Sequence, residues 1–306
     1  MFAVVIRSHD GAEDWFVHSD IKNYVIQLEE NDISDSESYL HPTNGVELRL
    51  TRELSPLKRC VGVKLPEGYY LDDYIGHKEK FIRALNTCKS IARKENRPIP
   101  IIIKIRCLLP EQRSIIKGIA NSLSNQFTLC RQPLVLEPEH ITINFSRDLY
   151  ESTYAIADVA KIYSEFSVQH PAYSCFNLAD AFANVRILDL LAMNKCGATS
   201  EESPSIFNIM NRYADTCNCA LLSFSTCYGL TNKDYMRGFK PANAEWLKRA
   251  IMGIRGILTL DDAHIFIEVH DYDDPERKEL RQSIEIVQSI LKGIEEQSND
   301  ISGMVS

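Results

Sequence analysis

From about residue 73 onward, the sequence alternates short apolar segments rich in β-branched residues with longer segments whose apolar residues recur at helical spacing. The run between Pro100 and Pro110 predicts a buried strand, and residues 73–96 predict an amphipathic helix with one apolar stripe. Strands that alternate with helices favour a sheet covered by helices, because a helical crossover joins parallel neighbours. The predicted fold class is therefore α/β, with α+β as the alternative.

The first 72 residues predict a β-rich region, because short apolar runs follow one another there with polar turns between them. The predicted strands of this region are 2–7, 14–18, 24–30, 46–52 and 60–66. In the following region the strands and helices are expected to pack on a mixed sheet. This gives the predicted organisation: a β-rich N-terminal region (1–72), an α/β region (73–296) and a polar tail (297–306).

Composition places the chain among ordinary globular proteins, with 306 residues, 44% of them hydrophobic and 25% charged. No apolar stretch approaches the ~20 residues that cross a bilayer, and the first residues have no basic leader. The nine cysteines are scattered and odd in number, as expected of reduced core thiols. We therefore expect a cytoplasmic protein without a membrane partner. Cys217, Cys219 and Cys227 lack the paired spacing of a zinc site and are interpreted as buried cysteines.

Charge is unevenly distributed along the chain, whose formal net charge is -8. Between His77 and Lys117 there are eleven Lys or Arg and three Glu, so this segment carries +8 and the remainder -16. A basic segment in an acidic protein is typical of a surface that binds phosphates. The predicted nucleic-acid-binding residues are Lys78, Arg83, Lys89, Arg93, Lys94, Lys104, Arg106, Arg113 and Lys117.

An acidic stretch near the C-terminus is the main candidate for chemistry. In the predicted strand 263–270, Glu268 and His270 share one face, and Asp271 follows directly. Carboxylates at the carboxyl end of a strand can hold Mg²⁺ and position water against a phosphodiester. The predicted catalytic residues are Glu268, His270 and Asp271, and the predicted metal ligands are Asp262, Glu268 and Asp271.

The same stretch has a structural interpretation. Pro275 suits the first position of a helix, which makes Asp274 its natural N-cap and explains part of the acidity without any ligand. A second candidate site pairs His140 and Thr142 on one strand face, as in two-histidine phosphoesterases, but the corresponding segment at His264 has Phe266 in place of the hydroxyl. The sequence contains no glycine-rich phosphate loop and no complete catalytic motif.

Together these patterns predict a nucleic-acid-binding or polyphosphate-binding protein that uses the basic segment 77–117 and acts as a Mg²⁺-dependent nuclease at Glu268. The alternative is a non-catalytic assembly subunit, in which the acidic N-terminal half of one copy contacts the basic segment of another copy or of a partner protein. Both hypotheses allow a homo-oligomer.

Overall fold

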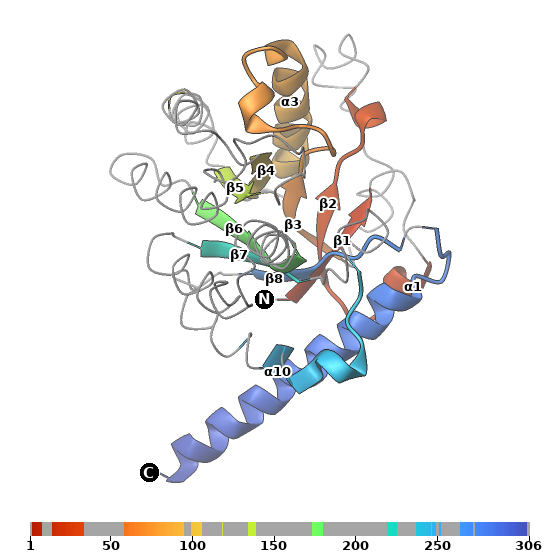
Figure 1. Cartoon of the computed structure of the whole chain (residues 1–306), viewed down its shortest axis with the longest axis vertical. Helices are drawn as coiled ribbons and strands as arrows, with labels where there is room; N and C mark the ends of the chain where they lie inside the picture. Colours follow the sequence, from red (N-terminus) through yellow and green to blue (C-terminus); the bar gives the residue numbers. More distant parts are fainter. Residues whose placement is uncertain are drawn as a thin grey trace, which may run out of the picture.

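Eight parallel strands close into a barrel in the computed structural model (Figure 1). The structure describes residues 2–7, 14–33, 58–94, 99–105, 118, 134–138, 173–179, 219–224, 237–245, 247–248, 251, 264–271 and 273–304. The strands are β1 (Phe2–Arg7), β2 (Asn23–Gln27), β3 (Arg59–Lys64), β4 (Ile101–Ile105), β5 (Leu134–Pro138), β6 (Tyr173–Asn177), β7 (Cys219–Phe224) and β8 (His264–Ile267). Each strand pairs with the next in chain order, and β8 returns to pair with β1.

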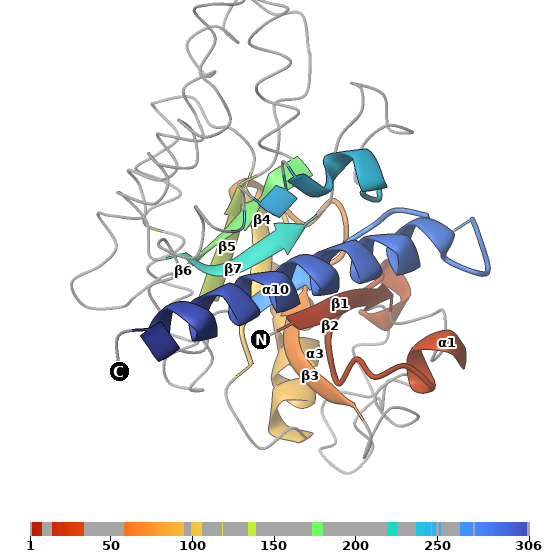
Figure 2. The ribbon, with the colours of Figure 1, turned by 90° about the horizontal axis from the view of Figure 1, so that it is seen from below.

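Helices follow several of these strands. They are α1 (Asp14–Val17), α3 (Lys78–Lys94) and α10 (Lys278–Met304), with the short 3₁₀ helices η1 (Glu30–Asp32), η3 (Leu71–Asp73) and η6 (Pro241–Asn243). The predicted apolar stripe of α3 is confirmed, since Phe81, Leu85 and Cys88 are buried. α10 contacts β8, and in Figure 2 its C-terminal end extends past the barrel strands.

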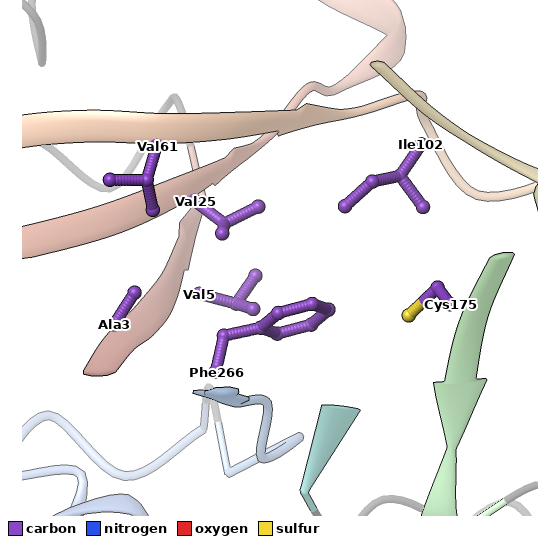
Figure 3. Close-up of a cluster of buried hydrophobic side chains, with 7 residues drawn as sticks. All are labelled: Ala3, Val5, Val25, Val61, Ile102, Cys175 and Phe266. Atoms are coloured by element: carbon purple, nitrogen blue, oxygen red, sulfur yellow. The ribbon is translucent and has the colours of Figure 1, made fainter. Parts of the chain in front are cut away.

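The barrel interior is filled by apolar side chains that converge from six of the strands (Figure 3). They are Ala3, Val5, Val25, Val61, Ile102, Cys175 and Phe266. In β1, β2, β3, β4 and β8 the neighbours of these residues along the strand, such as Val4 and Ile265, are buried as well, so these strands are buried on both faces. This explains why the strands occur in the sequence as continuous apolar runs.

The α/β class is confirmed, but the sheet is closed and entirely parallel, where the sequence predicts a mixed sheet. The β-rich character of the N-terminal region is not confirmed, because residues 14–17 form α1 and residues 46–52 lie outside the described part. β1, β2 and β3 belong to the same barrel as the later strands, so the sheet crosses the predicted boundary at residue 72.

The helix predicted from Pro275 begins later, at Lys278, and continues to Met304 through the predicted polar tail. Asp274 still accepts backbone hydrogen bonds, from Glu276 N at 3.0 Å and from Lys278 N at 3.3 Å. These N–H groups, that of Glu276 first, lower the pKa of this exposed carboxyl. The delay arises at Arg277, whose φ of 47° is incompatible with a continuous helix.

Several predicted features fall outside the described residues, among them His140, Thr142, Cys217 and Cys227. Cys60, Cys88 and Cys175, which the structure does describe, are buried. None of the helices in the described ranges combines the length and the apolar composition that a bilayer crossing requires.

Candidate active site

Polar residues gather at the carboxyl ends of the strands. β1 ends at Arg7, β2 at Gln27, β3 at Lys64 and β6 at Asn177, and Glu268 directly follows β8. The register pairs Gln27 with Lys64 across two neighbouring strands. In barrels of eight parallel strands, active sites lie at this end. The carboxyl end is therefore the candidate site, and the segments that form it are far apart in sequence.

A buried ion pair lies at the centre of this site. Lys64 Nζ donates to Glu268 Oε2 over 2.6 Å, and the two side chains are only 2% and 3% exposed. Burial alone would raise the pKa of Glu268, but the Lys64 ammonium, followed by His270 and Lys104, holds it well below its usual range. Glu268 is therefore ionised at neutral pH although it is buried.

His270 lies between this buried pair and solvent. Its Nε2 is 3.6 Å from Glu268 Oε1 and 3.9 Å from Glu67 Oε1, and its side chain is 23% exposed. An imidazole that reaches solvent and lies next to carboxylates is placed to act as a general acid or base. His270 is thus the accessible acid–base group of the described site.

Two further groups shape the rim and floor of the site. The Arg7 guanidinium contacts two carboxylates, with Nε 3.7 Å from Glu29 Oε1 and Nη2 3.6 Å from Glu67 Oε1. The buried Gln27 amide donates to the Leu65 carbonyl over 2.5 Å and so ties the end of β2 to the chain after β3. These contacts link the ends of β1 and β2 to the segments that follow β2 and β3.

A second buried ion pair holds the chain that follows His270. Arg277 Nε donates to Asp271 Oδ1 over 2.5 Å, and its Nη2 donates to the Val269 carbonyl over 3.0 Å. The other oxygen of Asp271 accepts from Leu280 N at 3.0 Å, inside the first turn of α10. Asp271 therefore fastens the segment of Glu268 and His270 to the start of α10.

The predicted metal ligands are not brought together among the described residues. Glu268 faces Lys64, Asp271 faces Arg277, and Asp262 lies outside the described part. In the described ranges no group of three or more His, Cys, Asp or Glu side chains is arranged to hold a metal ion. The trio of Asp262, Glu268 and Asp271 stays a prediction.

The basic segment is divided between two parts of the fold. Lys104, in β4, lies close enough to Glu268 to lower its pKa. Lys78 and Arg83 lie on α3, and on the same helix Lys80 Nζ is 3.0 Å from Glu30 Oε1. The structure does not describe the other predicted residues: it leaves out Arg106, Arg113 and Lys117 entirely and the side chains of Lys89, Arg93 and Lys94.

Sequence comparison finds no matching protein-family model and no matching curated protein. Solved structures, however, resemble the whole chain. A xylose isomerase domain-containing protein from Salmonella typhimurium LT2 aligns with a TM-score of 0.55 over 94% of this chain and 97% of its own, at 9% identity. The fold is a TIM barrel. A xylose isomerase-like TIM-barrel protein from Mycobacterium smegmatis, solved in complex with magnesium, aligns with a TM-score of 0.50 over 89% and 85%, at 10% identity.

The prediction of a nucleic-acid-binding protein or nuclease is wrong. The similar structures are xylose isomerase-like TIM barrels, a fold that places its chemistry at the carboxyl end of the strands. Of the predicted nucleic-acid-binding residues that the structure describes, Lys104 lies in β4, and Lys78 and Arg83 lie on α3. Self-association stays a prediction.

Lys64, Gln27, Asn177 and Arg7 are absent from the predicted site. Each ends a strand-like apolar run, as in "VGVK", "YVIQ", "SCFN" and "FAVVIR". A polar residue repeated at the end of successive buried strands is the signal that could have identified them, because those ends meet in a parallel barrel.

Proposed function

We propose that this protein is an enzyme that transfers protons on a small hydroxylated molecule at the carboxyl end of its barrel. The observation that carries the proposal is the buried Lys64–Glu268 pair beneath the accessible His270. A buried ion pair contributes little net stability compared with apolar packing, so its presence at the end where TIM barrels act favours a catalytic role.

His270 is the proposed acid–base residue. When its imidazole accepts a proton from the substrate, the ionised Glu268 at 3.6 Å stabilises the new positive charge and orients the ring. Lys64 acts indirectly, through Glu268, because its ammonium keeps this buried carboxylate ionised. Asp271 and Arg277 are positioning residues that hold the chain carrying His270.

The reaction class that suits this arrangement is isomerisation of a hydroxy aldehyde or hydroxy ketone. A base removes the proton from the carbon that bears the hydroxyl, and the carbonyl oxygen is protonated, which gives an enediol. The carbon-bound proton then returns to the former carbonyl carbon while the original hydroxyl oxygen loses its proton and becomes the new carbonyl, so the net change is a shift of two hydrogens within the substrate. One imidazole can perform both transfers, and no oxidant or second substrate is needed. The xylose isomerase-like names of the similar structures support a sugar-like substrate.

Magnesium is the cofactor expected from the sequence, and one similar structure contains it. The described acidic residues of this chain do not fit a Mg²⁺ ion, because Glu268 and Asp271 are engaged by Lys64 and Arg277. No step of the proposed mechanism passes through a metal. The cytoplasm remains the proposed location, supported by the scattered, odd-numbered cysteines, of which Cys60, Cys88 and Cys175 are buried in the core.

Proton exchange in D₂O tests the proposal directly. The full chain is incubated with a panel of aldoses, ketoses and their phosphates, and deuterium incorporation next to the carbonyl is followed by NMR. His270→Gln should lower the exchange rate at least ~100-fold, since general acid–base catalysis contributes about that much. His18→Gln, which alters an exposed histidine between α1 and β2, is the matched control and should leave the rate unchanged. Equal rates for the two variants, or no exchange with any substrate, would refute the proposal.

A further inference from the structure

Three acidic side chains at the carboxyl end, those of Glu268, Asp271 and Glu67, each contact a cationic side chain. Lys64 contacts Glu268 at 2.6 Å, and Arg277 contacts Asp271 at 2.5 Å. Arg7 contacts Glu67 at 3.6 Å. Mg²⁺ needs near-octahedral oxygen coordination at about 2.0 to 2.1 Å, from ligands that are not neutralised by other cations. The donor set therefore differs from that of a divalent metal site.

We infer that Lys64 supplies, as part of the chain, the positive charge that a divalent cation would supply next to Glu268, and that the site works without a metal ion there. The ammonium lies within hydrogen-bond distance of Glu268 Oε2, where a metal ion would bind. A divalent cation would also be repelled by this ammonium, because like charges a few ångströms apart in a buried setting interact strongly. The statement that the site works without a metal ion rests on the proposed function, whereas the statement about charge does not.

The geometry also predicts what removal of the ammonium would create. His270 lies within 4 Å of two carboxylates, those of Glu268 and Glu67. One imidazole and two carboxylates are ligands that Mn²⁺ and similar divalent ions accept. Lys64→Met removes the competing charge and keeps an apolar chain of similar length, so it should convert this group into a divalent-cation site.

A manganese titration without substrate tests the inference. The full chain is stripped with a chelator and titrated with Mn²⁺ at about pH 8, where histidine is neutral, and free Mn²⁺ is counted by electron paramagnetic resonance. Lys64→Met should bind Mn²⁺ at least ~10-fold more tightly than the unsubstituted chain, which is a modest estimate for the removal of one nearby charge. Adding Glu268→Gln to this variant should abolish the gain.

Lys80→Met is the matched control, because it removes a lysine that also contacts a glutamate, Glu30 at 3.0 Å, but on the exposed side of α3. It should leave Mn²⁺ binding unchanged. The inference is overturned if Lys64→Met binds no more tightly than the unsubstituted chain. It is also overturned if the unsubstituted chain binds one Mn²⁺ that Glu268→Gln removes.

If circular dichroism shows that Lys64→Met does not fold, the comparison of the unsubstituted chain with Glu268→Gln decides. Equal Mn²⁺ binding by the two supports the inference, and weaker binding by Glu268→Gln refutes it. Because no substrate is present, this result is independent of the deuterium-exchange test. If the chain binds no metal at Glu268 and catalyses no exchange, the proposed function is refuted and the inference about Lys64 is not.

Discussion

Two buried lysines lie at opposite ends of the same strand and are held in different ways. Lys58 directly precedes β3, and Lys64 is its last residue. Lys58 Nζ donates to the backbone carbonyls of Ser19 at 2.6 Å and Ile21 at 2.7 Å, and lies 4.8 Å from the centroid of the Phe16 ring. Lys64 Nζ instead contacts the Glu268 carboxylate.

The difference separates a local structural contact at the amino end of the barrel from a long-range contact in the proposed active site at the carboxyl end. Burial lowers the pKa of Lys58, and nearby Asp20 only partly opposes this. Its acceptors belong to the loop between α1 and β2, so the ammonium holds this loop against the start of β3. Lys64 has its partner 204 residues away, beside an accessible imidazole. The amino end of a TIM barrel is typically devoted to stability and the carboxyl end to function.

The largest expected effect comes from breaking the charge pair at the carboxyl end. Glu268→Gln removes the Glu268 counter-charge from the buried Lys64 ammonium and should lower the free energy of unfolding by about 3 to 5 kcal/mol. Urea denaturation followed by circular dichroism measures the change. The double variant Lys64→Met/Glu268→Gln should recover most of the loss, since neither charge remains. If the single variant loses less than about 1 kcal/mol of unfolding free energy, the pair contributes no more than an ordinary exposed salt bridge, which would contradict the prediction.

A smaller effect is expected at the amino end. Lys58→Met keeps the contact with the Phe16 ring but removes the donor to two carbonyls, and should lower the free energy of unfolding by about 1 to 3 kcal/mol. Deuterium exchange by the folded variant should match that of the unsubstituted chain. If exchange falls while the fold is intact, the division of roles between the two lysines is incorrect.

Acid should weaken the carboxyl end in a way that reports on Glu268. The folded pKa of this group lies below its ordinary value of 4.5, so below about pH 4.5 the unfolded chain binds a proton that the folded chain does not. Stability from this group is therefore complete above that pH and is lost as the pH falls, by at most about 2 kcal/mol between pH 4.5 and 3. Urea midpoints over this range should fall more steeply for the unsubstituted chain than for Lys64→Met/Glu268→Gln. Parallel curves would contradict the assignment.

The smallest effect is expected on the outside of the barrel. The pair of Lys80 and Glu30 is solvent-exposed, with 37% and 63% of the two side chains accessible. Lys80→Met should change the free energy of unfolding by no more than about 1 kcal/mol, because exposed ion pairs are screened by water and salt. The urea midpoint measures this. A loss as large as that of Glu268→Gln would show that burial is not what distinguishes Lys64.

The sequence predicts the strands that are uninterrupted apolar runs and the helix that has a clear stripe. β1, β3 and β4 are recognisable in this way, as is α3. β6 is harder, because its five residues, "YSCFN", mix apolar and polar residues and carry no strand period of their own. The segment 14–17 is an apolar, aromatic stretch that favours a strand by propensity, yet forms α1.

The site depends on long-range pairing, which local patterns do not contain. The alternation around β8 correctly places Phe266 and Ile265 on opposite faces, but it suggests that the even-numbered face is polar and open. In a closed barrel both faces are buried, so Phe266 joins the core and Glu268 needs an internal partner. That partner, Lys64, is visible in sequence only as a charge at the end of an apolar run.

Closure of the barrel depends on the pairing of β1 with β8, in which Ala3 lies opposite Phe266. The two strands are far apart in sequence, so the sheet cannot be closed until β8 has been synthesised. Until then β1 and β7 are open edges that can pair with other chains. A chain truncated before residue 264 would lack β8, keep both edges open and be prone to aggregation.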